Sequence, residues 1–497
     1  MARTAAGTAG TGPGTAGTMS EAVRPLGRTE GAGRRRLAGL AVADARYHVH
    51  VPGATGTGKT TLLSNMVLAD AAAGRGAVVL DPKGDMVTDL LDRLPAAVAG
   101  RLVLIDPSER DTPAALNILD GPDPELAADQ VVSVFRRIWG AWWGPRMDDI
   151  LRCACLTLAR VPGSTLADIP ALLTEPAVRA ALAGAASEGD PYLRGFWRWY
   201  DALPESGQAA AGPVLSRLRA VLTRRFAADL LGSARSSFDM RKVLDSGGLL
   251  LARLPKGQIG DDTARLAGSL VIAKAWQAAL GRASVPEGRR PDAALYADEC
   301  HNFLNLPGAL ESILDEARGY RLSLVLAHQH LGQLPRELAA SVAANARNKV
   351  CFTLSPDDAR VMARQMGPVL TETDLSHLGL YQAACRLIAG GADTAGFTLR
   401  TLPLPRPVPG RADLLRDAAR RFGRTREQRR ADELRRRHPG GRLARRVPPG
   451  VPAGASAGVP PGVLETPAET QPPGMPFPHV RGGSDRPAGK PDSWGQS

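Results

Sequence analysis

The sequence has 497 residues and is poor in cysteine, aromatic residues and lysine. Its five cysteines form no CxxC pair and no Cys/His set at ligand spacing, which argues against structural zinc and against a disulfide framework. An odd number of isolated cysteines fits a reducing compartment. Aromatic residues make up only 4% of the chain, and 7 of its 62 basic residues are lysines. The arginine excess accompanies abundant alanine and glycine, so it does not by itself indicate a nucleic-acid partner.

Long hydrophobic runs are also missing. Residues 1–20 are rich in Ala, Gly and Thr and lack the apolar segment of a signal peptide. The best candidate for a membrane span, 266–280, is short and contains Lys274. We therefore expect a cytoplasmic protein with no transmembrane segment of its own, which reaches the inner face of the membrane only through partners.

The net charge of +12 lies at the ends of the chain. Residues 406–446 hold 15 Arg against 5 acidic residues, and residues 1–47 add a smaller positive excess. The segment between them, 48–405, is close to neutral. Any electrostatic attraction to nucleic acid is therefore expected from the tails or from locally arranged charge. The basic segment itself either binds phosphates or is a solvated helix or tether.

Short apolar runs alternate with helical patterns from residue 47 to residue 405, which predicts an α/β fold with a mostly parallel sheet. Most of these runs are continuous, as in strands that are covered on both faces by helices. The expected strands are 47–51, 77–81, 102–106, 248–254, 293–298, 322–327, 349–354, 385–389 and 396–402. The expected helices between them are 59–73, 263–280, 308–318, 335–346 and 357–365.

One interval, 121–245, has helical periodicity and almost no strand signal, so we expect an all-helical insertion there. The remaining boundaries follow from composition. We expect a flexible leader at 1–45, the two parts of a nucleotide-binding domain at 46–120 and 246–405, a basic Arg-rich helix or tether at 406–447, and a disordered Pro/Gly-rich tail at 448–497.

A phosphate-binding loop is the most specific motif. The run GATGTGKT fits the pattern GxxxxGK[ST], between an expected strand and an amphipathic helix. Its glycines let successive backbone N–H groups point at phosphate oxygens, the lysine adds charge at the β- and γ-phosphates, and the threonine hydroxyl ligates Mg²⁺. The expected ligands of ATP are Gly53, Ala54, Thr55, Gly56, Thr57, Gly58, Lys59, Thr60 and Thr61.

A second motif consists of two acidic residues, which directly follow the apolar run AALYA. Asp298 is expected to share Mg²⁺ with Thr60, and Glu299 to act as the general base that polarises the attacking water. Two acids after a strand are common, and alone they would fit a helix N-cap pair equally well. Together with the phosphate-binding loop they favour ATP hydrolysis with Mg²⁺.

The order of these motifs resembles the HerA/FtsK superfamily of P-loop motor ATPases, and within it the type IV secretion coupling proteins of the TraG/TraD kind. The resemblance covers residues 47–402 and implies a RecA-like P-loop NTPase fold with an all-helical insertion. The motifs that carry it are GATGTGKTTLL at 53–63, VVLDPKGD at 78–85, DP at 106–107, NIL at 117–119, ADE at 297–299, EARGY at 316–320, LAHQ at 326–329 and Asn345.

The resemblance implies further catalytic roles. Gln329 would sense the γ-phosphate, or else be a loop residue that bonds backbone. Arg318 would reach the neighbouring subunit's nucleotide, or else only complement a helix dipole; Arg321 and Arg347 are alternatives. The segment holding Asp81, Lys83 and Asp85 would couple nucleotide state to the ring or to a DNA channel, or else form a solvated loop ion pair. His301 has no partner set at metal spacing, so ordinary hydrogen bonding is expected.

The tryptophans of the insertion could stack on bases, but their helical spacing favours a core role. They are Trp139, Trp142, Trp143, Trp197 and Trp199.

The function implied is a homohexameric motor that hydrolyses ATP with Mg²⁺ and moves DNA during conjugative transfer, with relaxosome or type IV secretion proteins as partners. Two alternatives are a protein-secretion ATPase that powers a type IV channel and a nucleotide-dependent cargo adaptor. Two features depart from the family pattern. No membrane helix precedes the phosphate-binding loop, and the 46 residues before the first expected strand are too few for a β-barrel domain.

Overall fold

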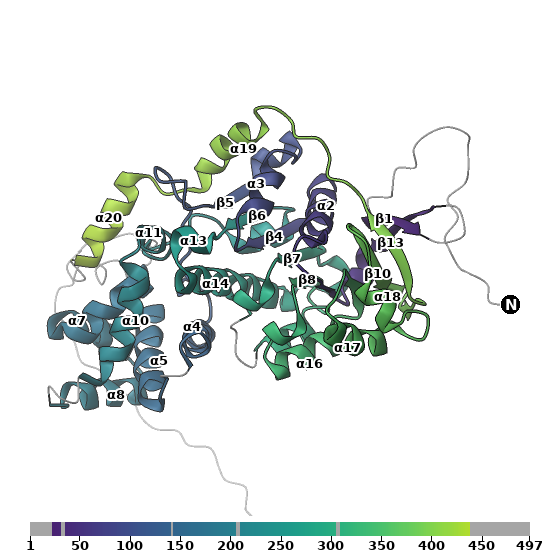
Figure 1. Cartoon of the computed structure of the whole chain (residues 1–497). Coiled ribbons are helices and arrows are strands. Elements are labelled where there is room, and N and C mark those ends of the chain that lie inside the picture. Colours follow the sequence, from purple (N-terminus) through teal and green to yellow (C-terminus); the bar gives the residue numbers. More distant parts are fainter. Residues whose placement is uncertain (1–21, 31–34, 141–142, 205–208, 305–308, 438–497) are drawn as a thin grey trace, which may run out of the picture. The chain divides into compact units, whose positions relative to one another are not determined.

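The computed structural model describes residues 22–30, 35–140, 143–204, 209–304 and 309–437. Its main sheet has eleven strands in the order β2-β1-β13-β10-β9-β3-β8-β7-β4-β6-β5 (Figure 1). A second sheet pairs β11 with β12. The strands are β1 (Val23–Glu30), β2 (Leu37–Ala41), β3 (Val49–Pro52), β4 (Gly76–Asp81), β5 (Leu102–Ile105), β6 (Leu249–Arg253), β7 (Ala293–Ala297), β8 (Leu322–His328), β9 (Asn348–Cys351), β10 (Gln382–Arg386), β11 (Ile388–Ala389), β12 (Ala392–Asp393) and β13 (Phe397–Thr401).

The seven strands from β9 to β5 are parallel, and four antiparallel strands extend the sheet beyond β9. Every residue of β4, β7 and β8 is buried, as expected of strands that are covered on both faces. The prediction of an α/β fold with a mostly parallel sheet is confirmed.

Successive residues of a strand point to opposite faces, so the two faces have separate cores. Val79 packs in one core with α2 (Lys59–Ala72) and α3 (Asp85–Leu91), whereas Leu80 packs in the other with α14 (Asp261–Leu280). In Figure 1, α2 and α3 lie above the sheet and α14 below it. The other elements after β6 are α13 (Lys256–Ile259), η5 (Gly281–Ser284), η6 (Glu287–Arg289), η7 (Cys300–Asn302), α15 (Ala309–Glu316), η8 (Leu331–Gln333), α16 (Arg336–Asn345), α17 (Pro356–Met366) and α18 (Glu372–Ser376).

The strand order brings the sequence motifs to one edge of the sheet. Strand β8 lies between β3 and β7, and β4 lies on the other side of β7. These four strands are parallel, so the segments that follow them meet at their carboxyl ends. The loop after β3, the acids after β7, Gln329 after β8 and Lys83 after β4 are therefore neighbours.

Between β5 and β6, all regular elements of the described residues are helical. Their apolar faces join the core on the α14 side of the sheet, and α4 packs directly on α14. The elements are η1 (Ala96–Arg101) before β5 and, after it, α4 (Pro124–Ile138), α5 (Pro145–Arg160), η3 (Leu166–Asp168), α6 (Ile169–Thr174), α7 (Pro176–Ala186), α8 (Pro191–Asp201), η4 (Ala209–Ala211), α10 (Gly212–Leu222), α11 (Arg225–Leu231) and α12 (Met240–Asp245).

The expectation of a flexible leader over 1–45 is wrong for its second half. Strands β1 and β2, followed by α1 (Val42–Ala45), extend the main sheet. Strand β1 is held because Leu26 is fully buried and because Arg24, also fully buried, pairs with Asp70 of α2. Residues 1–21 lie outside the described residues.

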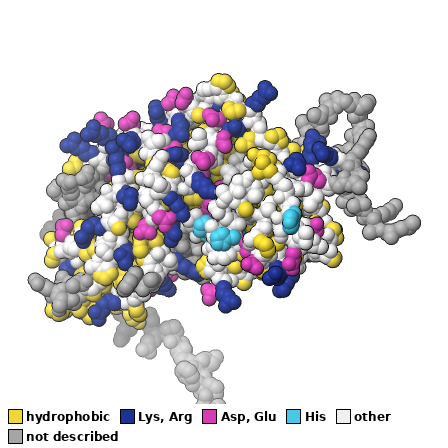
Figure 2. Space-filling model, viewed as in Figure 1, with side chains coloured by type: hydrophobic (Ala, Val, Ile, Leu, Met, Phe, Trp, Pro, Cys, Tyr) yellow, Lys and Arg dark blue, Asp and Glu magenta, His cyan; other side chains and the backbone are white. Residues whose placement is uncertain are grey.

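The first part of the basic C-terminal segment lies against the α/β unit. It forms α19 (Arg411–Ala419), η9 (Arg420–Phe422) and α20 (Arg426–Arg437), which together we call the C-terminal strap. Leu415 is fully buried, and Arg416 pairs with Asp106 and Glu109. Figure 2 shows Lys and Arg side chains near α20, with Asp and Glu among them. The expected tail at 448–497 lies outside the described residues.

The expected strands are all present, within a few residues of their predicted ends, and the run 385–389 is divided between β10 and β11. Between residues 47 and 405, helices α3, α13 and α18 lie outside the insertion and were not expected. None of the helices in the described part of the chain is long and apolar enough to cross a membrane.

Candidate nucleotide-binding and hydrolysis site

The phosphate-binding loop joins the fully buried strand β3 to α2 and is anchored to two other strands. Gly53 N–H donates to the carbonyl of His328 at the end of β8, and Ala54 N–H to that of Thr353 after β9. A Cβ on Gly53 would lie 2.5 Å from Phe352, and Gly58 has φ of +119°, so both positions require glycine.

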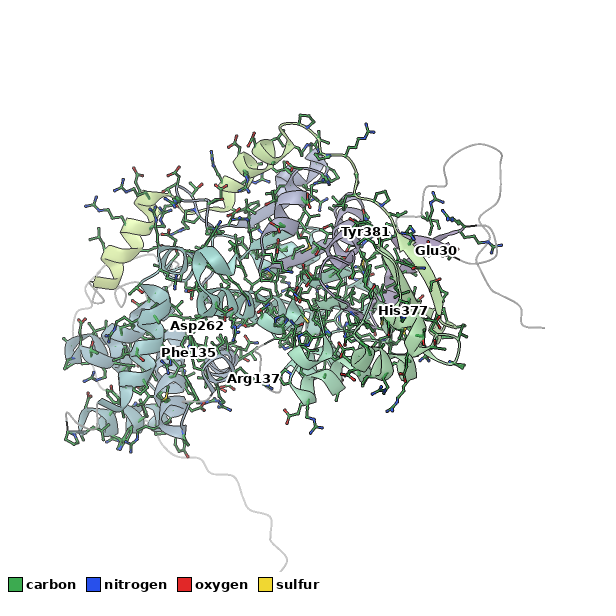
Figure 3. All side chains as sticks on the ribbon, in the orientation of Figure 1. Glu30, Phe135, Arg137, Asp262, His377 and Tyr381 are labelled. Atoms are coloured by element: carbon green, nitrogen blue, oxygen red, sulfur yellow. The ribbon has the colours of Figure 1, made fainter. Side chains whose placement is uncertain are left out.

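The far side of the loop is covered by the segment around Tyr381, which is labelled in Figure 3. Its backbone N–H donates to the carbonyl of Thr57, and its ring approaches Gly58. The strands beside it are tied together by Glu30, which accepts hydrogen bonds from Arg400 and Gln382. Ala54, Thr55 and Gly56 stay exposed at the tip, so their backbone is accessible to a ligand.

Lys59 and Thr60 are the first two residues of α2. The Lys59 side chain points toward the loop, and the Thr60 side chain points toward the end of β7. Lys59 Nζ is folded onto the loop and donates to the carbonyls of Gly53 (2.6 Å) and Ala54 (2.9 Å). Burial lowers the pKa of this ammonium. The hydroxyl of Thr60 donates to Asp298 Oδ2 at 3.1 Å. The two residues expected to share Mg²⁺ are thus in direct contact.

Asp298 directly follows β7 and is almost completely buried. Burial, together with the neighbouring carboxylates of Glu299 and Asp81, raises its pKa to about 6. Its oxygens and the Thr60 hydroxyl are hard ligands of the type Mg²⁺ prefers. No group of three His, Cys, Asp or Glu side chains suited to a metal occurs among the described residues, so Mg²⁺ here would complete its coordination with water and phosphate oxygens.

Glu299 has a strained backbone and a tightly held carboxylate. Its φ of +45° lies in the left-handed region, which is unusual for a residue with a long side chain. Oε1 accepts hydrogen bonds from Gln329 Nε2 (2.6 Å) and from Lys83 Nζ (2.8 Å). Burial raises the pKa of Glu299, but these bonds and the charge of Lys83 outweigh it, and the pKa lies below its usual value.

The second oxygen of this carboxylate is different. Among the described residues, Glu299 Oε2 is buried and makes no hydrogen bond. The Nδ1 atom of the His301 ring lies 3.8 Å from this oxygen. Burial lowers the pKa of His301, which favours the neutral ring.

The DPKGD segment contributes Lys83, for which the sequence predicted a place at the nucleotide edge of the sheet but no contact with Glu299. Asp81 does not pair with the Lys83 ammonium; its carboxylate accepts the backbone N–H groups of Lys83, Gly84 and Val87. The alternative of a solvated ion pair within the loop is therefore wrong. The signal that could have placed Lys83 is its position just after β4, next to the strand that carries Asp298 and Glu299.

Arg318 lies away from this site. It occupies the turn before β8, at the amino ends of the strands, whereas the phosphate-binding loop lies at their carboxyl ends. Its guanidinium stacks on the Tyr47 ring at 4.0 Å, and Arg347 stacks on the same ring at 4.9 Å. The other alternative, Arg321, donates to the carbonyl of Arg290. The structure thus joins Lys59, Thr60, Asp298, Glu299 and Gln329, but not Arg318.

Three of the tryptophans belong to the helical core. Trp197 is almost fully buried, and Trp139 and Trp143 pack against Phe135. Trp199 is 41% exposed, and Trp142 lies outside the described residues.

Comparisons with known proteins were made by sequence and by structure. Residues 35–118 match the family model of the type IV secretion-system coupling protein DNA-binding domain. No curated protein matches the chain by sequence. Among solved structures, the plasmid coupling protein TrwB in complex with a GTP analogue has a TM-score of 0.53 at 17% identity, covering 77% of this chain and 96% of its own.

Two further structures have similar folds. TrwB in complex with ADP and Mg²⁺ has a TM-score of 0.52 at 19% identity, covering 74% of this chain and 87% of its own. VirB4 of Thermoanaerobacter pseudethanolicus has a TM-score of 0.52 at 14% identity, covering 80% of this chain and 100% of its own. The resemblance seen in the motifs is thereby confirmed: the chain is a P-loop ATPase-fold protein similar to those of type IV secretion, with a match to the coupling-protein domain over residues 35–118.

Proposed function

We propose that this protein hydrolyses ATP with Mg²⁺ and uses the energy to move DNA in conjugative or other type IV secretion transfer. The observation that carries the proposal is the convergence on one edge of the sheet of the loop at 53–60, the Thr60–Asp298 contact and the Glu299 carboxylate. Gly53 to Thr61 would hold the nucleotide, with Lys59 leaving the loop carbonyls for the phosphates.

The hydrolytic roles divide between four side chains. Thr60 and Asp298 would hold the Mg²⁺, which when bound neutralises charge on the β- and γ-phosphates. Glu299 would accept the proton of the attacking water. Gln329 contacts the same carboxylate, so it is placed to link the state of the γ-phosphate to the base.

An oligomeric ring is the second part of the proposal. Arg318 is exposed at the edge of the sheet opposite its own nucleotide site, so any action on a phosphoryl group requires a second subunit. We infer a homo-oligomer, a hexamer by analogy with ring motors of this superfamily, in which Arg318 completes the neighbouring site. DNA as the cargo is supported by the family match at 35–118, and relaxosome or type IV secretion proteins would deliver it at the inner face of the membrane.

The testing experiment is the ATPase rate of the purified full chain with no DNA, with single-stranded DNA and with double-stranded DNA, alongside its mass in solution. We expect turnover that DNA stimulates. Lys59→Ala and Glu299→Gln should abolish turnover, and Glu299→Gln should still bind ATP. Normal DNA-stimulated activity of Glu299→Gln would refute the assignment.

A protein-secretion ATPase is the second candidate, because the fold of VirB4 matches over a larger share of both chains than that of TrwB. Stimulation by channel proteins and not by DNA would favour it. Binding of nucleotide without repeated turnover would instead indicate a cargo adaptor.

A further inference from the structure

Lys83 and Gln329 reach the same oxygen of Glu299 from opposite sides. Strand β7 carries Glu299 at its end and is flanked by β4 and β8. Lys83 follows β4 and Gln329 follows β8, so each neighbouring strand supplies one donor to Oε1, at 2.8 Å and 2.6 Å. The carboxylate is therefore held from both sides through one of its two oxygens.

The loop that presents Lys83 is itself fixed. Asp81, which is 1% exposed, accepts three backbone N–H groups from the residues that follow it. Gly84 has φ of +97°, and a Cβ there would lie 2.8 Å from the Arg253 side chain, so the turn requires glycine. The Lys83 side chain thus extends from a fixed turn that places its ammonium within hydrogen-bond distance of Glu299.

Lys59, the other lysine near the site, does not hold the Glu299 carboxylate. Lys59 Nζ donates to two loop carbonyls, whereas Lys83 makes the lysine ion pair with Glu299. Lys83 is 48% exposed along its side chain and Glu299 only 4%. The contact therefore joins a solvent-accessible cation to a buried carboxylate whose Oε2 makes no hydrogen bond within the described part of the chain.

We propose that Lys83 is a positioning residue for Glu299, which together with Gln329 holds Oε1 and leaves Oε2 as the oxygen that accepts the proton of the attacking water. The inference rests on the proposed hydrolysis of ATP. In the step it serves, the water oxygen forms a bond to the γ-phosphorus and the bond to the bridging oxygen of ADP breaks. The water proton passes to Oε2, and ADP and phosphate leave.

The test compares kcat and KM for ATP in the full-length protein and its Lys83→Met, Lys83→Arg and Lys242→Met variants. Lys83→Met removes the ammonium donor. The methionine side chain takes the place of the partly exposed lysine methylenes, so no cavity forms. We expect it to lower kcat about tenfold or more and to change KM by no more than about twofold. Lys83→Arg keeps a charged donor and should recover much of kcat. Lys242 is exposed on α12, so Lys242→Met is the matched control and should behave as the wild type.

A second comparison asks whether Lys83 acts through Glu299. Because Glu299→Gln should leave no steady-state turnover, the comparison uses its residual single-turnover rate, which Lys83→Met should not lower further since the group it positions is already gone. An equal loss in both backgrounds would overturn the proposal. So would a Lys83→Met variant with raised KM and unchanged kcat, since Lys83 would then be a phosphate ligand.

A measurement that needs no turnover distinguishes failure of this inference from failure of the proposed function. If the wild type does not hydrolyse ATP, the shifts in Tm of Lys83→Met, Glu299→Gln and the double variant still report the contact. Non-additive shifts would support the Lys83–Glu299 contact in solution, and additive shifts would exclude it.

Discussion

Arg24 and Asp70 form an ion pair at 2.9 Å in which both side chains are fully buried. The pair joins β1 to α2, the helix that begins with Lys59. Asp70 also accepts hydrogen bonds from Arg75 and from the hydroxyl of Tyr296 on β7. Burial alone would raise the pKa of Asp70, but the two arginines and the tyrosine hold it below its usual value. Strand β1 is therefore bound, through Asp70, to α2, which follows the loop at 53–58, and to β7, which precedes Asp298 and Glu299.

Replacing Asp70 by Asn should destabilise the fold by about 3–5 kcal/mol, because Arg24 would remain buried without a counter-charge. Urea unfolding of the two proteins measures this difference. The exposed Arg360–Glu372 pair is the control, since its side chains are 58% and 53% exposed. Arg360→Ala should change stability by less than about 1 kcal/mol. Equal effects of the two substitutions would contradict the structural role of the buried pair.

The hydroxyl of Thr60 should be required for Mg²⁺-dependent nucleotide binding. Thr60→Ser keeps the hydroxyl that donates to Asp298, whereas Thr60→Val keeps the shape and removes it. Titration of a fluorescent ATP analogue, with Mg²⁺ and with a chelator, should show a loss of about tenfold in affinity for Thr60→Val with Mg²⁺ only, equivalent to about 1.4 kcal/mol. A valine variant with unchanged Mg²⁺ dependence would exclude Thr60 as a ligand.

Much of the fold could be predicted because its strands are continuous apolar runs. Strand β1 could not, since VRPLGRTE mixes charged residues, Pro and Gly. The buried charge of Arg24 in this strand is compensated by Asp70, which lies 46 residues away in the sequence. The contact between Lys83 and Glu299 could not be predicted for the same reason: the two residues are 216 residues apart, and only the order β8-β7-β4 makes them neighbours.

Acid should destabilise the protein through buried neutral histidines. His48 Nε2 donates to the carbonyl of Leu314 and Nδ1 accepts from Leu324 N–H, so both ring nitrogens are used in the neutral form. Burial lowers the pKa of His48 to about 4. The unfolded chain therefore binds this proton more readily than the folded chain. The contribution of neutral His48 to the free energy of unfolding is complete above about pH 6.5 and falls as the pH drops toward 4.

The expected loss from His48 is about 3 kcal/mol between these two pH values. Unfolding free energies at several pH values test it. His48→Asn tolerates the left-handed backbone at this position, where φ is +56°, and removes the titrating ring, so its stability should vary less with pH. His377, which is exposed, provides the control: His377→Asn should leave the pH dependence as in the wild type.

The C-terminal strap should contribute to stability, which affects how a role of the strap in DNA binding can be tested. Leu415 is fully buried in the core on the α2 side of the sheet. Leu415→Ala should cost about 2–5 kcal/mol, whereas Leu414→Ala, at a position 48% exposed, should cost much less. Thermal unfolding compares the two. Truncation at Pro405 would remove this packing, so it cannot separate a binding role from a folding role.

Substitution of exposed arginines in the strap is the cleaner test of DNA binding. Arg426 and Arg430 are exposed on α20, so replacing both by Gln should leave the fold intact. If they contact phosphates, the salt dependence of DNA affinity should weaken by about 1–2 units of slope. An unchanged slope and affinity would limit the strap to a structural role.

Arg318 gives the sharpest test of a ring. Tyr47 holds its guanidinium at the edge of the sheet opposite the nucleotide site of the same subunit. If Arg318 acts on the neighbour, Arg318→Ala and Glu299→Gln should each be inactive alone. A mixed ring would place an intact Glu299 opposite an intact Arg318 at about a quarter of its sites, so an equal mixture should regain turnover. The control replaces the second partner by the Arg318→Ala/Glu299→Gln double variant, which supplies no arginine and should restore nothing. Recovery with this control, or full activity of Arg318→Ala alone, would assign the phosphoryl-contacting arginine elsewhere.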